Sequence, residues 1–304
     1  MISYLRSTHY RPVIKQRDSL QPGTWIRSER PTAEEQEQLI GLGIDSDLMA
    51  DALDPHEVPR VEMEAGWTYF ITRLPDTDDD FNDYTTPVLF ALGDQYIVTV
   101  SRDSLGRLWQ PFIDNIQAPT TQKTKLFMLM LEAISRQYQT RVASINRQMR
   151  AATSDIRSLG SKDITTLTEY ERKLNDYLDA LQPTNTALEK ILGGRLLPLY
   201  EDDRDLVEDI SIEFEQLIAR CVSLLRTITN LRDSYRAVMD TRLNETIRLL
   251  TVATLAFTVP TMIAGLYGMN VEIPGDNLPY IFWVVVGISV TISALLAFYF
   301  LRKK

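Results

Sequence analysis

The distribution of apolar residues near the C-terminal end of the chain predicts two membrane-spanning helices. Residues 249–270 include no charged side chain, and a second apolar run covers residues 278–301. At about 1.5 Å of rise per residue, a helix of either length crosses the roughly 30 Å hydrocarbon core of a bilayer. We therefore expect a first transmembrane helix over 249–270, an outer loop over 271–277 and a second transmembrane helix over 278–301.

The first of these helices has one polar face. Its polar and small residues recur in steps of three, four or seven positions, which places them on one side of a helix. They are Asn244, Thr251, Thr254, Thr258, Thr261, Gly265 and Gly268. Two interpretations fit this pattern. The face either lines a pore with oxygen atoms, or it lets another helix approach closely while each hydroxyl group bonds to the carbonyl group four residues earlier.

A long helix is predicted upstream of the membrane. Residues 202–259 include neither glycine nor proline, so a stalk helix over 201–248 can continue directly into the first transmembrane helix. Apolar residues along it alternate in steps of four and three, which is the repeat of a coiled coil. These residues are Ile210, Phe214, Leu217, Cys221, Leu224, Ile228, Leu231, Tyr235 and Val238. The stalk is therefore expected to pack against another helix, either a copy of itself in a homo-oligomer or the preceding helical hairpin.

Residues 119–200 are predicted to form that helical hairpin region. Residues 122–157 and 161–181 are charged, amphipathic and almost free of glycine and proline, which predicts two long antiparallel helices joined near Gly160. A third helical stretch is expected over 183–191, before glycine and proline residues interrupt the pattern.

Residues 1–118 are predicted to form a mixed α/β domain. Segments rich in β-branched and aromatic residues predict strands, and two segments that open with a capping residue and acidic side chains predict helices. The expected strands cover residues 1–5, 24–28, 67–74, 87–92 and 96–101, and the expected helices open at Thr32 and Ser46. The predicted fold class is an α+β cytoplasmic domain followed by a long stalk helix and two C-terminal transmembrane helices.

Composition and charge exclude several functions. The 304 residues carry a net charge of −9, which argues against a nucleic-acid partner and favours cations. No glycine-rich phosphate loop follows a predicted strand, and the spacing provides no nucleophile with a general base, so we expect no enzyme. A single cysteine, Cys221, and two distant histidines, His9 and His56, argue against a zinc site. The acidic run 76–80 is interpreted as a solvated hairpin loop, with weak attraction of cations as the alternative.

The flanking charges predict the orientation of the two spans. Arg242 and Arg248 precede the first span, a basic tail over 302–304 follows the second, and the loop between them has no lysine or arginine. By the positive-inside rule, both termini lie in the cytoplasm, and the loop with Glu272 and Asp276 lies outside. The N-terminal residues lack the apolar stretch of a signal peptide. We expect a multi-pass protein of the cell inner (plasma) membrane.

The end of the first span is the most specific feature of the sequence. The residues Tyr267, Gly268, Met269 and Asn270 stand there, followed by a short loop and the second span. In this arrangement the chain resembles the CorA family of magnesium channels, whose mark is a Gly-Met-Asn triplet at the outer end of the first of two C-terminal membrane helices. The resemblance implies a homopentameric funnel in the lipid bilayer, with Mg²⁺ as both the transported and the regulatory ion.

On this account, individual residues of the first span take roles in the pore. Asn270, with the backbone around Gly268 and Met269, forms the outer selectivity site. Thr261 is the candidate for the next ring along the axis, and Asn244 is the candidate for a ring at the cytoplasmic side.

The resemblance implies further roles for residues on the cytoplasmic side. Ile247 and Leu250 match apolar rings that act as a gate in the family. By spacing, Asp51 and Asp209 match a carboxylate pair that binds regulatory Mg²⁺ between neighbouring subunits and holds the pore closed. Asp233 matches a carboxylate ring that faces the axis. The alternative for each of these aspartates is simple exposure to solvent or a surface ion pair.

Rings of neutral oxygen atoms suit Mg²⁺, because this ion holds its water tightly and such rings accept hydrogen bonds from that water without creating a deep well. After the triplet, many family members have an MPEL loop, whereas this chain has VEIPGDN. The choice among magnesium, cobalt, nickel and zinc therefore stays open, and a zinc-transporting branch of the same fold is one alternative. A non-conducting two-span receptor or scaffold, in which the threonine face only packs, is the other.

Overall fold

The computed structural model describes residues 1–8, 11–77, 83–115, 119–152, 161–269 and 280–302. Its contacts divide the chain into two compact units, Met1–Asn230 and Leu231–Lys304. The boundary between the units lies inside one helix, α6 (Glu201–Tyr267). Predictions that concern His9, residues 78–80, Gly160, Asn270, the loop 271–277 and residues 303–304 lie outside the described residues.

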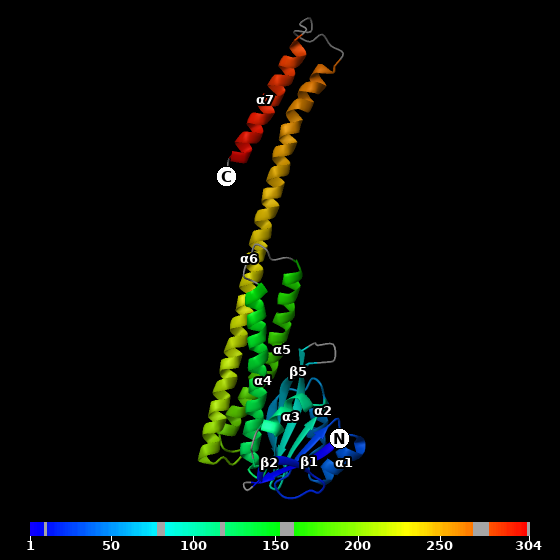
Figure 1. The fold of residues 1–304 in the computed structure, drawn as a ribbon, viewed down its shortest axis with the longest axis vertical. Helices are drawn as coiled ribbons and strands as arrows, with labels where there is room; N and C mark the ends of the chain where they lie inside the picture. Colours follow the sequence, from blue (N-terminus) through cyan, green and yellow to red (C-terminus); the bar gives the residue numbers. More distant parts are fainter. Residues whose placement is uncertain (9–10, 78–82, 116–118, 153–160, 270–279, 303–304) are drawn as a thin grey trace. The chain divides into compact units, whose positions relative to one another are not determined.

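A seven-stranded sheet organises the first unit (Figure 1), with the strand order β2-β1-β3-β7-β6-β5-β4. The strands are β1 (Ile2–Thr8), β2 (Arg11–Arg17), β3 (Trp25–Glu29), β4 (Arg60–Glu64), β5 (Trp67–Thr77), β6 (Asp83–Leu92) and β7 (Ile97–Ser101). Strands β3 and β7 pair in parallel, and the other neighbours pair antiparallel. The five strands expected from the sequence correspond to β1, β3, β5, β6 and β7.

The two strands that the sequence did not predict, β2 and β4, lie at the edges of the sheet. Their sequences, RPVIKQR and RVEME, are rich in charged residues. Charged side chains are typical of edge strands, which have one side without a pairing partner and face solvent over much of their surface. An apolar alternation that marks a strand is therefore weak in both segments.

Two short helices, α1 (Ala33–Gly41) and α2 (Ser46–Leu53), pack on one face of the sheet. Thr32 caps α1 as expected, and its side chain and that of Glu35 form a reciprocal capping box. The expected cap of α2 was wrong by one residue. Asp45, and not Ser46, is the N-cap, because its carboxylate accepts hydrogen bonds from the backbone N–H groups of Asp47 and Leu48 at 2.9 and 3.0 Å.

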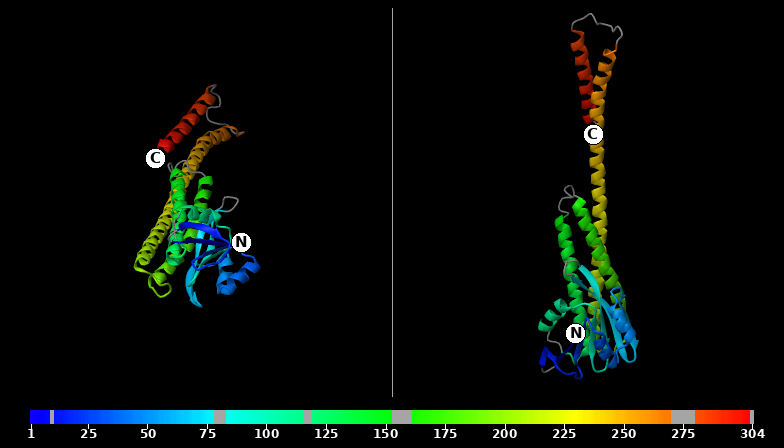
Figure 2. Two further views of the ribbon diagram at one scale, coloured as in Figure 1. Left: turned by 60° about the horizontal axis from the view of Figure 1, so that its bottom comes forward. Right: turned by 90° about the vertical axis from the view of Figure 1, so that its right-hand side faces the viewer.

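The other face of the sheet carries an aromatic core and longer helices. These are α3 (Gly106–Asn115), which the sequence did not predict, α4 (Lys123–Ala152) and α5 (Ser161–Leu192). Trp109 of α3 contacts Trp25 and Phe90 edge to face, and Phe127 of α4 contacts Phe70. Helices α4 and α5 lie side by side in every view (Figures 1 and 2), which confirms the hairpin.

Helix α5 corrects the expectation of a break near Pro183. The helix continues through this residue to Leu192, so the stretch expected as a separate third helix is its last part. A proline inside a helix costs roughly 3 kcal/mol because it removes one backbone hydrogen bond and crowds the preceding turn. Tertiary packing offsets this cost, since Leu181 and Leu188 are buried and the Thr184 hydroxyl lies 2.8 Å from that of Thr72.

Helix α6 is continuous over 67 residues, as the absence of glycine and proline predicted, and it includes Pro260. Within the first unit its apolar seam is buried in the single chain, from Ile210 to Ile228. Two hydrogen bonds join α6 to the hairpin beside the seam. The Ser135 hydroxyl of α4 donates to Glu213 of α6 at 2.8 Å, and the Ser211 hydroxyl of α6 donates to Asn185 of α5 at 2.9 Å. The sequence left two partners for the seam, a copy of α6 or the hairpin of α4 and α5. Within the first unit, it is the hairpin that packs against the seam.

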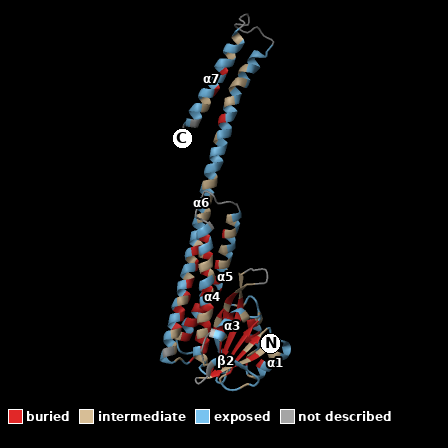
Figure 3. Ribbon diagram, in the orientation of Figure 1, coloured by how far each residue is buried: buried red, intermediate tan, exposed pale blue. Residues whose placement is uncertain are grey.

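The second unit consists of the remainder of α6 and of α7 (Ile281–Arg302). Both helices contain a stretch that is long and apolar enough to cross a membrane. Most large apolar side chains on them are exposed (pale blue in Figure 3), and Trp283, for example, is 72% exposed. Exposure on this scale is unfavourable in water, so the chain is a membrane protein with two C-terminal apolar helices.

Candidate functional site

The polar face of α6 presents a row of hydroxyl oxygens whose protons are already in use. Thr251, Thr254, Thr258 and Thr261 donate to the backbone carbonyl oxygens four residues earlier, at 2.7 to 2.9 Å. All four threonines are exposed in the chain. Each hydroxyl therefore keeps its lone pairs free and acts toward the outside as a hydrogen-bond acceptor.

Helix α7 does not cover this polar face. Val252 of α6 is only 6% exposed, and Ser289 and Ser293 of α7 are also buried, whereas the threonines remain exposed. Arg248 of α6 donates to the carbonyl oxygen of Phe300, near the C-terminal end of α7. The contact between the two helices of this unit thus uses another side of α6, and the row of hydroxyl groups is left without a partner from α7.

The C-terminal end of α6 closes with two backbone hydrogen bonds. The N–H group of Gly268 donates to the carbonyl oxygen of Ala264 at 3.0 Å, and that of Met269 donates to Leu266 at 3.4 Å. A Cβ atom added at Gly268 would lie 3.3 Å from the Ala264 oxygen, which is a tight contact. Glycine therefore lets the chain end the helix here with little crowding. Asn270, the expected filter residue, lies outside the described residues.

The residues expected at the cytoplasmic end of the pore are uncovered in the chain. Ile247 is 52% exposed and Leu250 is 68% exposed, and Asn244 is exposed as well. Asp233, expected to face the axis, lies 3.8 Å from Arg236 one turn along α6, and both side chains are largely exposed. An exposed pair of this kind contributes little to stability, on the order of 0–1 kcal/mol.

The structure gives Asp51 a counter-ion that the sequence did not reveal. Its carboxylate lies 2.6 Å from Arg60 on the edge strand β4, and Arg60 also pairs with Glu57 and Glu62. Burial opposes the charge on Arg60, but the hydrogen bonds that its guanidinium donates to Glu62 and Asp51 outweigh burial and raise the pKa of Arg60. A cation bound at Asp51 has to compete with this arginine.

The expected partner of Asp51 belongs to a different element, since Asp51 lies in α2 and Asp209 lies in α6. Asp209 is exposed on α6, and no ion pair of the described residues joins it to another side chain. Among those residues there is also no group of three or more histidine, cysteine, aspartate or glutamate side chains that could hold a metal ion.

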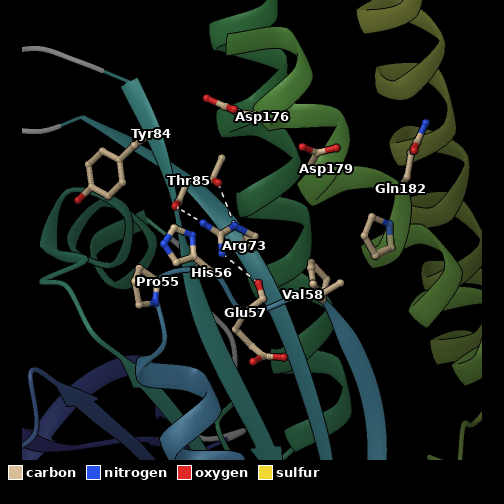
Figure 4. Close-up of a pocket in the computed structure, with 12 residues that line it drawn as sticks. Pro55, His56, Glu57, Val58, Arg73, Tyr84, Thr85, Asp176, Asp179 and Gln182 are labelled. Carbon is tan, nitrogen blue, oxygen red and sulfur yellow. Dashed lines mark hydrogen bonds between the residues drawn. The ribbon is translucent and has the colours of Figure 1, made fainter. Parts of the chain in front are cut away.

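A groove of about 720 Å³ beside β5 and α5 is a feature that the sequence did not suggest (Figure 4). Arg73 extends into it and donates to the Thr85 hydroxyl, the Thr85 carbonyl and the Glu57 carbonyl at 2.6 to 2.9 Å. Burial lowers the pKa of Arg73 and raises that of Asp176, which also lines the groove. Because the guanidinium already bonds to three protein acceptors, it fastens the segment around Glu57 to the sheet.

Cys221 and His56 lie in different surroundings. Cys221 is buried in the seam of α6, and burial raises the pKa of its thiol to about 12. His56 is exposed at the edge of the groove.

Comparison with solved structures supports this architecture over the whole length. The complete structure of the CorA magnesium transporter from Methanocaldococcus jannaschii matches with a TM-score of 0.87 at 21% identity, covering 100% of this chain and 98% of that one. The full-length CmaX protein matches with a TM-score of 0.78 at 18% identity, over 99% and 97% of the two chains. At these identities the matches establish the fold.

Sequence comparison adds curated relatives. The cobalt/magnesium transport protein CorA of Methanocaldococcus jannaschii is 25% identical over 92% of this chain and 90% of its own length. The protein of the same name from Thermotoga maritima is 23% identical over 98% and 88%. The family described as CorA-like Mg²⁺ transporter protein matches residues 21–303. Its members are ion transporters and not enzymes, and this chain belongs to that family.

Proposed function

We propose that the protein is a channel that passes hydrated Mg²⁺ across the membrane into the cytoplasm. The observation that carries this proposal is the exposed row of threonine hydroxyl groups on α6, which α7 leaves uncovered. The outward lone pairs of these four hydroxyl groups gain no hydrogen bond from lipid, whereas water or the polar groups of other copies of the helix can donate to them. A ring of copies around a hydrated axis supplies both.

The chemistry of this face suits a hydrated divalent cation. Mg²⁺ prefers octahedral oxygen geometry and gives up its water reluctantly. Because each threonine proton is donated within the helix, the outward lone pairs accept hydrogen bonds from the water molecules around the ion. Neutral acceptors hold the hydrate weakly enough for the ion to leave.

In the proposed channel five chains surround the axis, and both termini of each chain lie in the cytoplasm, beneath the inner membrane. Asn270, Gly268 and Met269 form the outer filter, and Thr261 and Asn244 form inner rings. Ile247 and Leu250, both exposed in the single chain, form the apolar gate. Ion entry is downhill, because about 2.3 kcal/mol per charge per 100 mV amounts to roughly 4.6 kcal/mol for a divalent ion.

The proposed brake is Mg²⁺ bound between neighbouring subunits by Asp51 of one chain and Asp209 of the next. Two carboxylates brought together repel each other unless a cation lies between them, so occupancy by the ion favours closed packing. Arg60 is part of this arrangement, because it already neutralises Asp51 in the single chain. Because Arg60 competes with Mg²⁺ for Asp51, the site binds Mg²⁺ weakly. A weak site is filled only when the concentration of Mg²⁺ in the cell is high, as a sensor of a replete cell requires. Asp233 adds negative charge along the axis.

The test of the proposed function is Mg²⁺ uptake into proteoliposomes by the wild-type protein and by the Asn270→Asp variant. A ring of carboxylates competes for the inner-shell water of the ion and deepens the binding well. If the well deepens by about 1.4 kcal/mol, the ion escapes roughly tenfold more slowly. The control is Asn277→Asp, which adds the same charge to the outer loop. Absence of uptake by the wild type would refute the proposal, and unchanged flux in Asn270→Asp would remove Asn270 from the filter.

Cobalt is a second candidate cargo, because the names of two relatives join cobalt to magnesium. The same proteoliposomes, loaded with an indicator for each ion, measure the uptake of Co²⁺, Ni²⁺ and Zn²⁺ beside that of Mg²⁺. Competition of Mg²⁺ with Co²⁺ at similar concentrations indicates one shared path, whereas uptake of Zn²⁺ without Mg²⁺ would favour the zinc alternative.

A further inference from the structure

The edge of the sheet formed by β1 and β2 carries an unusual concentration of positive charge. A groove of about 520 Å³ lies on it, and the lining residues are Arg6, Ser7, Thr8, Val13, Lys15 and Arg17. Three of these six side chains are cationic and none is acidic, although the chain as a whole has a net charge of −9. Lys15 and Arg17 are exposed, and Arg6 is half-buried.

The strand register places these cations against one another. Arg6 lies directly opposite Lys15 in the antiparallel pair, and Arg17 lies two residues farther along the same strand, opposite Tyr4. Directly opposed side chains have Cβ atoms about 5 Å apart, and like charges at this distance destabilise the pair. Among the described residues, no carboxylate forms an ion pair with any of the three. The arrangement therefore costs stability in the absence of an anion.

The guanidinium of Arg6, one of the residues that line the groove, is fixed by a neighbouring side chain. Its Nη1 atom donates to the side-chain oxygen of Gln21, which holds the guanidinium in position, while its Nε atom is buried and has no hydrogen-bond partner among the described residues. A guanidinium offers two parallel N–H groups that match the oxygen atoms of a phosphate group.

We propose that this groove binds a soluble anion with two or more phosphate groups. A ligand with several phosphates can contact Arg6, Lys15 and Arg17 together and relieve their mutual repulsion, whereas a single small anion meets fewer of them. A lipid surface fits less well, because the cations line a concave groove rather than a broad flat face. This site is separate from the residues assigned to ion conduction and extends the protein's function beyond it.

A simpler reading of the same charges is protection of an edge strand. Proline and charged side chains on an edge discourage pairing with other chains, and β2 has both. That role requires only that the edge be charged, not that three cations converge on one groove. Measurement of ligand binding separates the two readings.

The experiment is isothermal titration of the full-length protein in detergent with sodium tripolyphosphate, in buffer freed of divalent cations. We expect saturable binding by the wild type that weakens as salt screens the charges. Lys15→Glu should weaken binding by at least about tenfold, because it removes one charge-assisted contact and adds a repulsive one. The matched control is Lys190→Glu, an exposed lysine on α5, which should leave the affinity unchanged.

Thermal unfolding supplies a second readout. Lys15→Glu places a carboxylate opposite Arg6, so its melting temperature without anion should be at or above that of the wild type. Tripolyphosphate should raise the melting temperature of the wild type and of Lys190→Glu, but not that of Lys15→Glu. Absence of binding by the wild type, or equal binding by Lys15→Glu, would overturn the proposal and leave edge protection as the explanation.

Discussion

The threonines of α6 show how one local hydrogen bond decides what a side chain can do. A threonine hydroxyl can donate or accept, but once it donates to the carbonyl four residues earlier only its acceptor capacity faces outward. For helix packing this change is neutral, whereas for a hydrated cation it is favourable, because water around a cation presents hydrogen atoms. The same bond is compatible with both interpretations of the polar face, and cation uptake by a variant without the hydroxyl oxygen distinguishes them.

The prediction at this scale concerns Thr261. Thr261→Val keeps the shape and removes the oxygen, so Mg²⁺ uptake into proteoliposomes should fall by roughly fivefold for about 1 kcal/mol of lost interaction. Thr261→Ser should retain most of the uptake. The matched control is Thr291→Val on α7, whose hydroxyl makes the same bond to Gly287 at 2.7 Å. Equal loss in Thr291→Val would assign the effect to helix packing.

At the scale of elements, Asp83 joins three parts of the first unit. This residue opens β6, and its carboxylate lies 2.5 Å from Arg141 of α4 and 3.0 Å from Lys173 of α5. Arg141 also donates to the Thr77 hydroxyl at 2.9 Å, near the end of β5. All three charged side chains are partly buried, so the cluster fastens the β5–β6 ends to the helical hairpin more firmly than an exposed pair could.

We predict that Asp83→Asn lowers the free energy of unfolding by about 2 kcal/mol, because it leaves two partly buried cations without a counter-ion. The measurement is thermal unfolding of the purified full-length protein, with a drop of several degrees in the melting temperature. Glu37→Gln removes an exposed carboxylate from α1 and serves as the control. A melting temperature equal to that of the control would show that the cluster does not contribute.

At the scale of the whole molecule, the chain leaves several surfaces incomplete. Asp209, which we propose as half of a regulatory pair, is exposed on α6, the row of threonine hydroxyl groups is exposed, and Ile247 and Leu250, which we propose as the gate, are exposed as well. A symmetric oligomer would complete all three at once, because every chain would offer the same face to the axis and the same side to its neighbour.

Crosslinking of the protein in native membranes tests this assembly. We predict a ladder of products that ends at the pentamer, since amine-reactive reagents reach the exposed lysines of each copy. Cys221 is buried, and the raised pKa of its thiol keeps it unreactive, so it adds no disulfide-linked products. Dilution in detergent before crosslinking is the control for chance encounters. Products no larger than dimers would contradict a pore on a shared axis.

Limited proteolysis across a Mg²⁺ titration tests the regulatory pair. Asp209→Lys places a positive charge opposite Asp51 of the neighbouring chain, so protection of the cytoplasmic part should persist without Mg²⁺. Asp209→Ala removes the site, and protection should be weaker at every Mg²⁺ concentration. Asp205→Lys, one turn earlier on α6, is the matched control and should behave like the wild type. The assignment is wrong if all four proteins are protected over the same range of concentration.

The interpretation of α5 shows the limit of local rules. A proline ordinarily ends or kinks a helix, and Pro183 suggested a break that does not occur. The residues on either side of it pack on the sheet, and this contact depends on strands about one hundred residues earlier in the chain. The N-cap of α2 was predicted one residue too late, at Ser46 instead of Asp45. Both residue types are good caps, and only the backbone geometry distinguishes them.

The sequence by itself determined the features that repeat along one helix or strand. The two apolar spans, the continuous α6, its polar face and the five inner strands follow from periodicity and from the absence of helix breakers, which are local properties. The tertiary structure alone decided which edges β2 and β4 occupy, that the hairpin fills the seam of α6, and that Arg60 neutralises Asp51. These outcomes depend on pairing between residues that are distant in sequence, and no periodic pattern records such pairing.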